Sequence, residues 1–347
     1  MINLLIDAPL LACPTEELTD KPLNQQFIDF ATALTDLSKF RRSLSSATIW
    51  REASLGSTLF KINAYPFRHA IAAIMKKLDP ELGFQLEDIS SLAIALLSKS
   101  NCINEFVELE DVAINNCEIA NDSIPDRIAS LREYACRTTE FALCHLGESD
   151  KIPDSVRMTS GIQNQKNPAI FRYSLDMTSY RDGSVCCPSI DRAVAIKWFC
   201  GSELTLRDID PTLIWPRADD SSLLDALAIL AANQGDITYN ALLDFKNKIK
   251  IGGSFSHTCQ KYGFLHETSK VRRLMGAVVD ICSNRNLDRS HWLRKGAGPN
   301  EAQKTREGGG SAWRHDIDDE FHLHYWNDGR VIELANVVVH NDFAITS

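Results

Sequence analysis

Two histidines and one glutamate near the end of the chain have the residue types and spacing for acid–base chemistry. His322 and His324 are two positions apart, so a β-strand would place both imidazoles on one face. Glu333 follows across a tight turn and is expected opposite His324. A carboxylate beside an imidazole favours its protonated form and orients it for proton transfer. The same three side chains suit iron, zinc or manganese, and a solvated sheet face with one ion pair is a third interpretation.

A β-hairpin must position these residues. Residues 320–326 and 331–340 alternate in the manner of strands, and Asp328-Gly329 between them suits a two-residue type I′ turn. Alternation predicts a core face of Phe321, Leu323, Tyr325, Ile332 and Leu334, and a polar face that carries the histidines. The register that follows pairs Asn327 with Arg330, Trp326 with Val331, Tyr325 with Ile332, His324 with Glu333, and Leu323 with Leu334.

A cationic stretch precedes this hairpin. Residues 246–314 hold fourteen Lys and Arg against five Asp and Glu, although the whole chain has a net charge of −9. Subtraction from the totals of 37 and 46 leaves 23 basic and 41 acidic residues elsewhere. Such asymmetry indicates a polyanion-binding surface, or else a charge-separated solvated surface.

Inside the stretch, cations alternate with tryptophans and a glycine run at 308–310. Glycines allow a backbone to approach a phosphate, cations neutralise it, and tryptophans stack on unpaired bases. No G-x-x-x-x-G-K-[ST] motif occurs here, so the segment is not a Walker A loop. A long surface loop is the alternative. The predicted nucleic-acid contacts are Arg294, Lys295, Lys304, Arg306, Arg314, Trp292 and Trp313.

Five of the nine histidines fall in the last 57 residues. A metal-independent ribonuclease needs a base for the 2′-hydroxyl, an acid for the leaving oxygen and cations for the phosphorane, and His, Arg and Lys supply these near neutral pH. The predicted catalytic set is therefore His322, His324, Glu333 and His291, with no metal and no cofactor.

Residues 313–340, W-R-H-D-I-D-D-E-F-H-L-H-Y-W-N-D-G-R-V-I-E-L-A-N-V-V-V-H, follow a helical pair and a basic loop. This order resembles the ending of RelE/ParE-type toxins, over about the last 100 residues. The resemblance implies ribosome-dependent messenger cleavage or gyrase poisoning, with Arg314 and a hairpin residue near the phosphate.

Apolar spacing predicts helices in most of the first 150 residues, at 24–37, 66–78, 87–97 and 125–145. Residues 158–168 form the best linker candidate, and strands are expected at 170–175 and 194–199. Helices return at 221–234, 237–249 and 267–284, with Ser221-Ser222 and Asp236 as N-caps of the first two. The fold class is α+β. The predicted parts are a helical scaffold or docking domain (1–157), a small strand-rich segment (169–217) and a basic helical region with the C-terminal hairpin (218–347).

Other features narrow the function classes. Ten scattered cysteines contain no C-x-x-C pair, which argues against zinc knuckles and thioredoxin-like sites. The N-terminus lacks the basic region of a secretory signal, and no stretch approaches 18 apolar residues, so we expect a cytoplasmic protein that has no membrane partner. Asp7, after an apolar strand, suits a metal-dependent nuclease only with further acids at strand ends. The acids at 219–220 and 316–320 are expected to cap helices and turns.

Three hypotheses remain; the last is a small-molecule enzyme that uses a metal held by the hairpin. The first is a nucleic-acid-processing enzyme, a metal-independent nuclease that acts on RNA. The second is a non-catalytic subunit of a bacterial assembly, for instance one directed against phage. Its basic part would hold RNA or single-stranded DNA, and its acidic helical part would dock on a protein partner.

Overall fold

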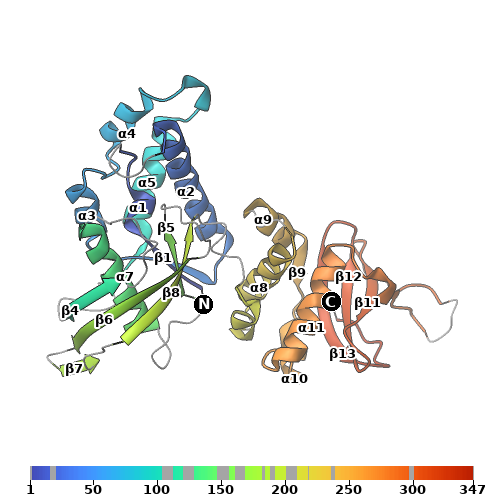
Figure 1. Cartoon of the computed structure of the whole chain (residues 1–347). Coiled ribbons are helices and arrows are strands. Elements are labelled where there is room, and N and C mark those ends of the chain that lie inside the picture. The colour runs from blue at the N-terminus through green and yellow to red at the C-terminus, as the bar shows by residue number, and fades with distance from the viewer. Residues whose placement is uncertain are drawn as a thin grey trace. The chain divides into compact units, whose positions relative to one another are not determined.

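The computed structural model describes residues 2–15, 21–103, 112–119, 129–146, 156–160, 169–181, 184–187, 192–200, 209–217, 219–235, 239–296 and 301–346. The chain divides into two compact units (Figure 1). The first comprises Met1–Arg42 and Ala47–Thr205, and the second comprises Ser43–Ser46 and Leu206–Ser347. Both units combine helices with a sheet, so the predicted α+β class is confirmed.

The first unit is built on a sheet of order β3-β2-β1-β5-β8-β6-β4, with β7 paired to β6. Its five parallel strands are β3 (Asn101–Cys102), β2 (Ala47–Arg51), β1 (Ile2–Ile6), β5 (Val156–Ser160) and β8 (Arg192–Cys200). Antiparallel strands β6 (Ala169–Arg181), β4 (Val112–Ile119) and β7 (Ser184–Cys187) complete it. Every residue of β1 is buried, as expected for a continuous apolar strand with neighbours on both sides.

Four predicted helices occur in this unit: α2 (Leu23–Ser43), α4 (Arg68–Met75), α5 (Leu86–Lys99) and α7 (Ala129–Leu146). The short helices α1 (Ala8–Leu11) and α3 (Leu55–Lys61) were not predicted. In α2 the apolar residues at helical spacing are buried, among them Phe27, Leu34 and Leu37. The expected start and end of the fourth helix, Pro125 and Gly147, lie outside the described residues. Within the described part of the chain, no helix has the length and apolar character needed to cross a membrane.

Two expectations about this part of the chain are corrected. Residues 158–160 belong to β5, where Met158 is fully buried, so they are not linker; residues 161–168 lie outside the described chain. The strands of the 169–217 segment join the sheet of β1 and β5. That segment is therefore no separate part, because its strands complete backbone hydrogen bonding for β5.

The second unit orders its five strands β10-β11-β12-β13-β9. They are β10 (Ser290–Trp292), β11 (Ser311–Asp316), β12 (Phe321–Asn327), β13 (Ile332–Val339) and β9 (Ile249–Ile251), antiparallel except for the β13–β9 pair. Gly252 follows β9 where the backbones converge, because a Cβ there would lie 2.6 Å from the Leu334 carbonyl oxygen.

Helices α8 (Asp220–Asn233), α9 (Tyr239–Asn247), α10 (Phe255–Lys261) and α11 (Thr268–Cys282) complete this unit. α10 and α11 pack on one face of the sheet (Figure 1), which we call the helix-covered face. Asp219 caps α8 by accepting a hydrogen bond from the Ser222 backbone N–H, in place of the predicted Ser221-Ser222 cap; Asp236 lies outside the described residues.

The hairpin forms, but its predicted register is wrong. Asn327 pairs with Ile332, and a bulge between His324 and Tyr325 moves the partner of His324 to Asn336. The Asn327 and Asp328 carboxamide and carboxylate oxygens accept hydrogen bonds from backbone N–H groups of the loop. With these bonds the strands are connected by a longer loop, residues 328–331, in which Gly329 has a φ of 87°. Every later pair is displaced as a consequence.

Candidate functional site

The polar side of the second sheet carries most of the candidate residues. Alternation and register place Arg314 of β11, His324 of β12 and Asn336 of β13 in one cross-strand row. The neighbouring row contains Asp316 and His322. The face thus carries imidazole, carboxylate and guanidinium groups.

This face is covered by the last described residues, 341–346, which we call the tail. Asn336 Nδ2 donates to the Ala344 carbonyl at 3.0 Å, and Trp326 Nε1 donates to the Thr346 carbonyl at 2.7 Å. All of β12 from Phe321 to Trp326 is buried. His322 and His324 are therefore buried, and the tail seals much of the polar face, which we call the tail-covered face.

His324 illustrates the consequence. It is fully buried, and its Nδ1 lies 2.9 Å from the Ala344 carbonyl oxygen, which only accepts hydrogen bonds. Nδ1 therefore carries the proton. Burial lowers the pKa of His324 to about 4, despite the favourable bond to Ala344. His324 is a neutral tail anchor near pH 7, with no access to a substrate.

Glu333 does not meet His324 either. It lies opposite Trp326 in the register, and its Oε2 accepts hydrogen bonds from Lys250 Nζ and Arg306 Nη1, each at 3.1 Å. Burial opposes ionisation of Glu333, but the two cationic donors outweigh it and hold its pKa below the ordinary value. The predicted imidazole–carboxylate pair is replaced by a structural ion-pair cluster.

A different carboxylate meets the imidazoles. Asp316, at the end of β11, lies with Oδ1 2.8 Å from His322 Nδ1 and Oδ2 3.7 Å from His291 Nε2. The ring of His340 contacts the ring of His322 with centroids 4.7 Å apart. His291 and His340 are exposed, Asp316 is one-third exposed, and His322 is 3% exposed. We call these four residues the Asp316 cluster.

Several opposing effects act on the pKa of His322 in the Asp316 cluster. Burial lowers the pKa of His322, the Asp316 carboxylate raises it, and Arg314 and His340 lower it; the result is below the ordinary value. The pKa of His315, which lies on the helix-covered face, is also lowered, and burial is again the largest cause. Its Nδ1 lies 2.8 Å from Ser290 Oγ. Asp316 and His340 were missed because Asp316 was assigned to a solvated turn. A β11–β12 pairing drawn from the sequence would have found the Asp316–His322 contact.

The predicted phosphate contacts divide into two groups. Lys304 donates to the Phe343 carbonyl at 2.7 Å, Arg306 bonds Glu333 and lies over the Trp326 ring, and Arg314 lies over the Phe343 ring. These three cations are engaged with the tail or the sheet. Arg294 and Lys295 are exposed on the segment after β10.

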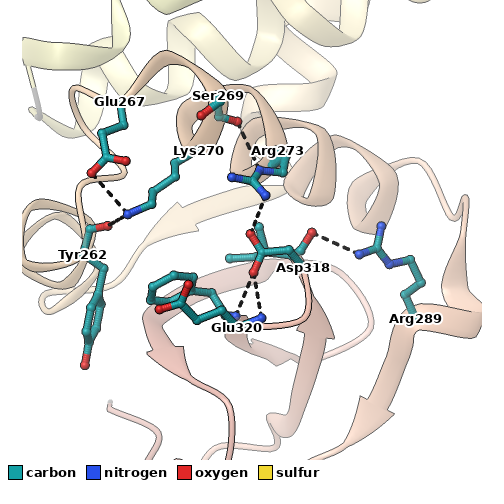
Figure 2. A network of polar contacts seen from close by, with 10 residues as sticks. Tyr262, Glu267, Ser269, Lys270, Arg273, Arg289, Asp318 and Glu320 are labelled. Carbon is teal, nitrogen blue, oxygen red and sulfur yellow. Dashed lines mark hydrogen bonds and ion pairs between the residues drawn. The ribbon is translucent and has the colours of Figure 1, made fainter.

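Other cations of the basic stretch hold the turn between β11 and β12 (Figure 2). Asp318 Oδ1 accepts the backbone N–H groups of Glu320 and Phe321, and its Oδ2 lies 2.9 Å from Arg273 Nη1. Arg289 donates to the Ile317 carbonyl. The capping roles expected for Asp219, at a helix, and for Asp318, at a turn, are confirmed, and this network fixes the turn next to Asp316.

The predicted base-stacking tryptophans lie at the β10 edge of the sheet. Trp292 is 56% exposed and meets Trp313 edge-on, with centroids 6.4 Å apart. Trp313 in turn stacks on Tyr325 at 6.5 Å. Trp292 is thus an exposed ring with a rigid aromatic support, whereas Trp313 is mostly that support.

In the first unit a second acid joins Asp7. Asp7 follows β1 and Glu52 follows the parallel strand β2, so both buried carboxylates lie at the same end of the sheet. Tyr134 joins the two strand ends: its hydroxyl donates to the Ile6 carbonyl and accepts from the Glu52 backbone N–H. Burial, with both carboxylates nearby, raises the pKa of Tyr134. Across the described ranges, no three His, Cys, Asp or Glu side chains are arranged to hold a metal ion.

Comparisons with models of known families, with curated proteins and with solved structures find no match for this chain. The resemblance of residues 313–340 to RelE/ParE-type toxins therefore stays a prediction from the sequence pattern.

Proposed function

We propose that the second unit binds RNA and cleaves its phosphodiester backbone without a metal ion. One observation carries the proposal: a single carboxylate, Asp316, lies between two imidazoles, and a third imidazole contacts one of them. A carboxylate that fixes the orientation of an imidazole is the usual support for proton transfer by histidine.

The two exposed imidazoles, His291 and His340, are the proton-transfer groups of this proposal. One removes the proton of the 2′-hydroxyl, whose oxygen attacks the adjacent phosphorus, and the other protonates the departing 5′-oxygen. The products are a 2′,3′-cyclic phosphate and a free 5′-hydroxyl. His322 connects the other members of the cluster, because it contacts both Asp316 and His340.

Compared with the set predicted from the sequence, the proposal keeps His291 and His322 and replaces His324 and Glu333 by His340 and Asp316. Arg314 lies on the same face of β11 as Asp316, and its positive charge favours a phosphorane near the Asp316 cluster although its guanidinium lies over the Phe343 ring. Trp292 follows His291 directly at the sheet edge and offers its exposed ring to an unpaired base.

The test compares cleavage of a labelled RNA with that of the same sequence lacking 2′-hydroxyls. The expected result is a 2′,3′-cyclic phosphate end from the RNA alone, unchanged by a chelator. His291→Ala and Asp316→Asn are expected to slow cleavage by about 100-fold or more. His257→Ala, an exposed histidine of α10, is the matched control and should cleave at the wild-type rate. Absence of cleavage, or equal rates in Asp316→Asn and His257→Ala, would refute the enzyme proposal.

A second candidate is nucleic-acid binding without cleavage, within a multi-protein assembly. It is favoured by the exposed ring of Trp292 next to the exposed cations Arg294 and Lys295. Salt-dependent binding that survives Asp316→Asn but is lost in Trp292→Leu and Lys295→Glu would support it. The acidic balance outside residues 246–314 suits a protein partner for the helical N-terminal part.

A further inference from the structure

The tail occupies a groove that binds it mainly through its main chain. Four side-chain donors, from β12, β13 and the loop before β11, point at tail carbonyl oxygens: Lys304 at Phe343, His324 and Asn336 at Ala344, and Trp326 at Thr346. Their lengths lie between 2.7 and 3.0 Å. Main-chain recognition of this kind accepts any extended segment that reaches the same positions.

One aliphatic side chain of the tail packs into the groove floor. Ile345 packs against a buried cluster formed by Leu293, Ala312, Trp326 and Ala335. Thr346 adds hydrogen bonds from its Oγ1 to the Ala335 carbonyl and from its N–H to Asn336 Oδ1. The groove therefore selects an extended strand with a β-branched aliphatic residue followed by a hydroxyl residue.

A short turn connects β13 to the tail. Asp342 N–H donates to the Val339 carbonyl at 3.1 Å, and Asn341 between them has a φ of 76°. Positive φ is a left-handed conformation that asparagine tolerates and that β-branched residues strongly disfavour. This turn, residues 340–342, is the hinge that directs the tail back over its own sheet.

We infer that the groove also binds the tail of a second copy of this chain, with two copies exchanging tails reciprocally. Every groove contact described above is kept in such an exchange, so the two forms differ only in the hinge and in the cost of association. The chain's own tail acts at an effective concentration on the order of millimolar. The monomer therefore predominates at micromolar concentration, and the population of exchanged dimer increases when the closed hinge is strained. This inference is independent of the proposed function.

A pair of hinge variants tests it. Asn341→Val is expected to lower the equilibrium constant for closing the hinge by about tenfold in each copy. Because two hinges open in the exchanged dimer, the dimer association constant rises by about 100-fold. Asn341→Gly relieves the same strain and should stay as monomeric as the wild type. Light scattering and sedimentation over a concentration series measure both. Equal association constants for the two variants would overturn the inference.

A complementation experiment identifies the groove as the interface. Both changes are made in the Asn341→Val background. Ile345→Asp disrupts the packing of the tail and leaves the groove intact, whereas Asn336→Ala removes a hydrogen-bond donor of the groove and leaves the tail intact. Neither variant should dimerise alone, but a mixture should form a one-to-one dimer in which one intact tail enters one intact groove. Far-ultraviolet circular dichroism verifies that each is folded, and single conservative variants (Ile345→Ala, Asn336→Asp) replace either one that is not. A mixture that stays monomeric, or variants that dimerise separately as well as together, would overturn the inference.

Discussion

Substituting His324 tests whether the tail seals the polar face. The buried imidazole has a pKa of about 4 in the folded chain, against 6.5 for a solvent-exposed imidazole, the state that the unfolded chain resembles. Between these values the unfolded state binds more protons than the folded state, so stability falls as pH falls. The stability that His324 contributes is fully present above pH 6.5 and is lost progressively toward pH 4. The full difference amounts to roughly 3 kcal/mol, and about 2 kcal/mol of it falls between pH 7 and pH 4.5.

His324→Asn is the informative change. The asparagine Nδ2 stands near the position of the imidazole Nδ1 and keeps a donor for the Ala344 carbonyl, but it does not titrate. Because the smaller side chain leaves a cavity, the variant is less stable at both pH values. The measured quantity is therefore the change between pH 7 and pH 4.5, and we expect that change to be about 2 kcal/mol smaller in His324→Asn.

Urea unfolding followed by tryptophan fluorescence at the two pH values supplies the measurement. His315 and His322 have pKa values lowered in the same direction, but both remain in the variant, so the comparison isolates His324. His257→Asn, on the exposed side of α10, is the control and should match the wild type. An equal pH effect in His324→Asn and wild type would mean that the imidazole is accessible, and the tail-covered face would be refuted.

The remaining predictions concern neighbouring contacts. Gly252→Ala should destabilise the second unit by about 2 kcal/mol or more in urea unfolding, because its Cβ would meet the Leu334 carbonyl oxygen at 2.6 Å. Gly253→Ala, with open space at its Cβ, should change stability by less than about 0.5 kcal/mol; similar losses in both variants would contradict this packing. Glu333→Gln should cost about 1 kcal/mol in the same assay, through weaker bonds from Arg306, without slowing RNA cleavage. Loss of cleavage there would restore the carboxylate role first predicted for Glu333.

The site predicted from the sequence was partly correct because alternation along a strand is a local property. His322 and His324 share a face of β12, as expected from their spacing of two. Their partners were wrong because hairpin register depends on how the loop satisfies its backbone N–H groups. The side chains of Asn327 and Asp328 supply acceptors, and a bulge adds a further shift.

What the sequence alone determined is the α+β class and the positions of its strongly periodic elements. α2, α5 and α11 repeat apolar residues at helical spacing, and β12 and β13 alternate around a glycine turn, so short-range geometry is sufficient to predict them. Tertiary structure alone decided which polar groups meet. Asp316 reaches His291 and His322 through cross-strand pairing, and the tail folds back to bury His324. The Asp316–His291 contact and the burial of His324 under the tail join residues far apart in the chain, which alternation within one hairpin does not predict.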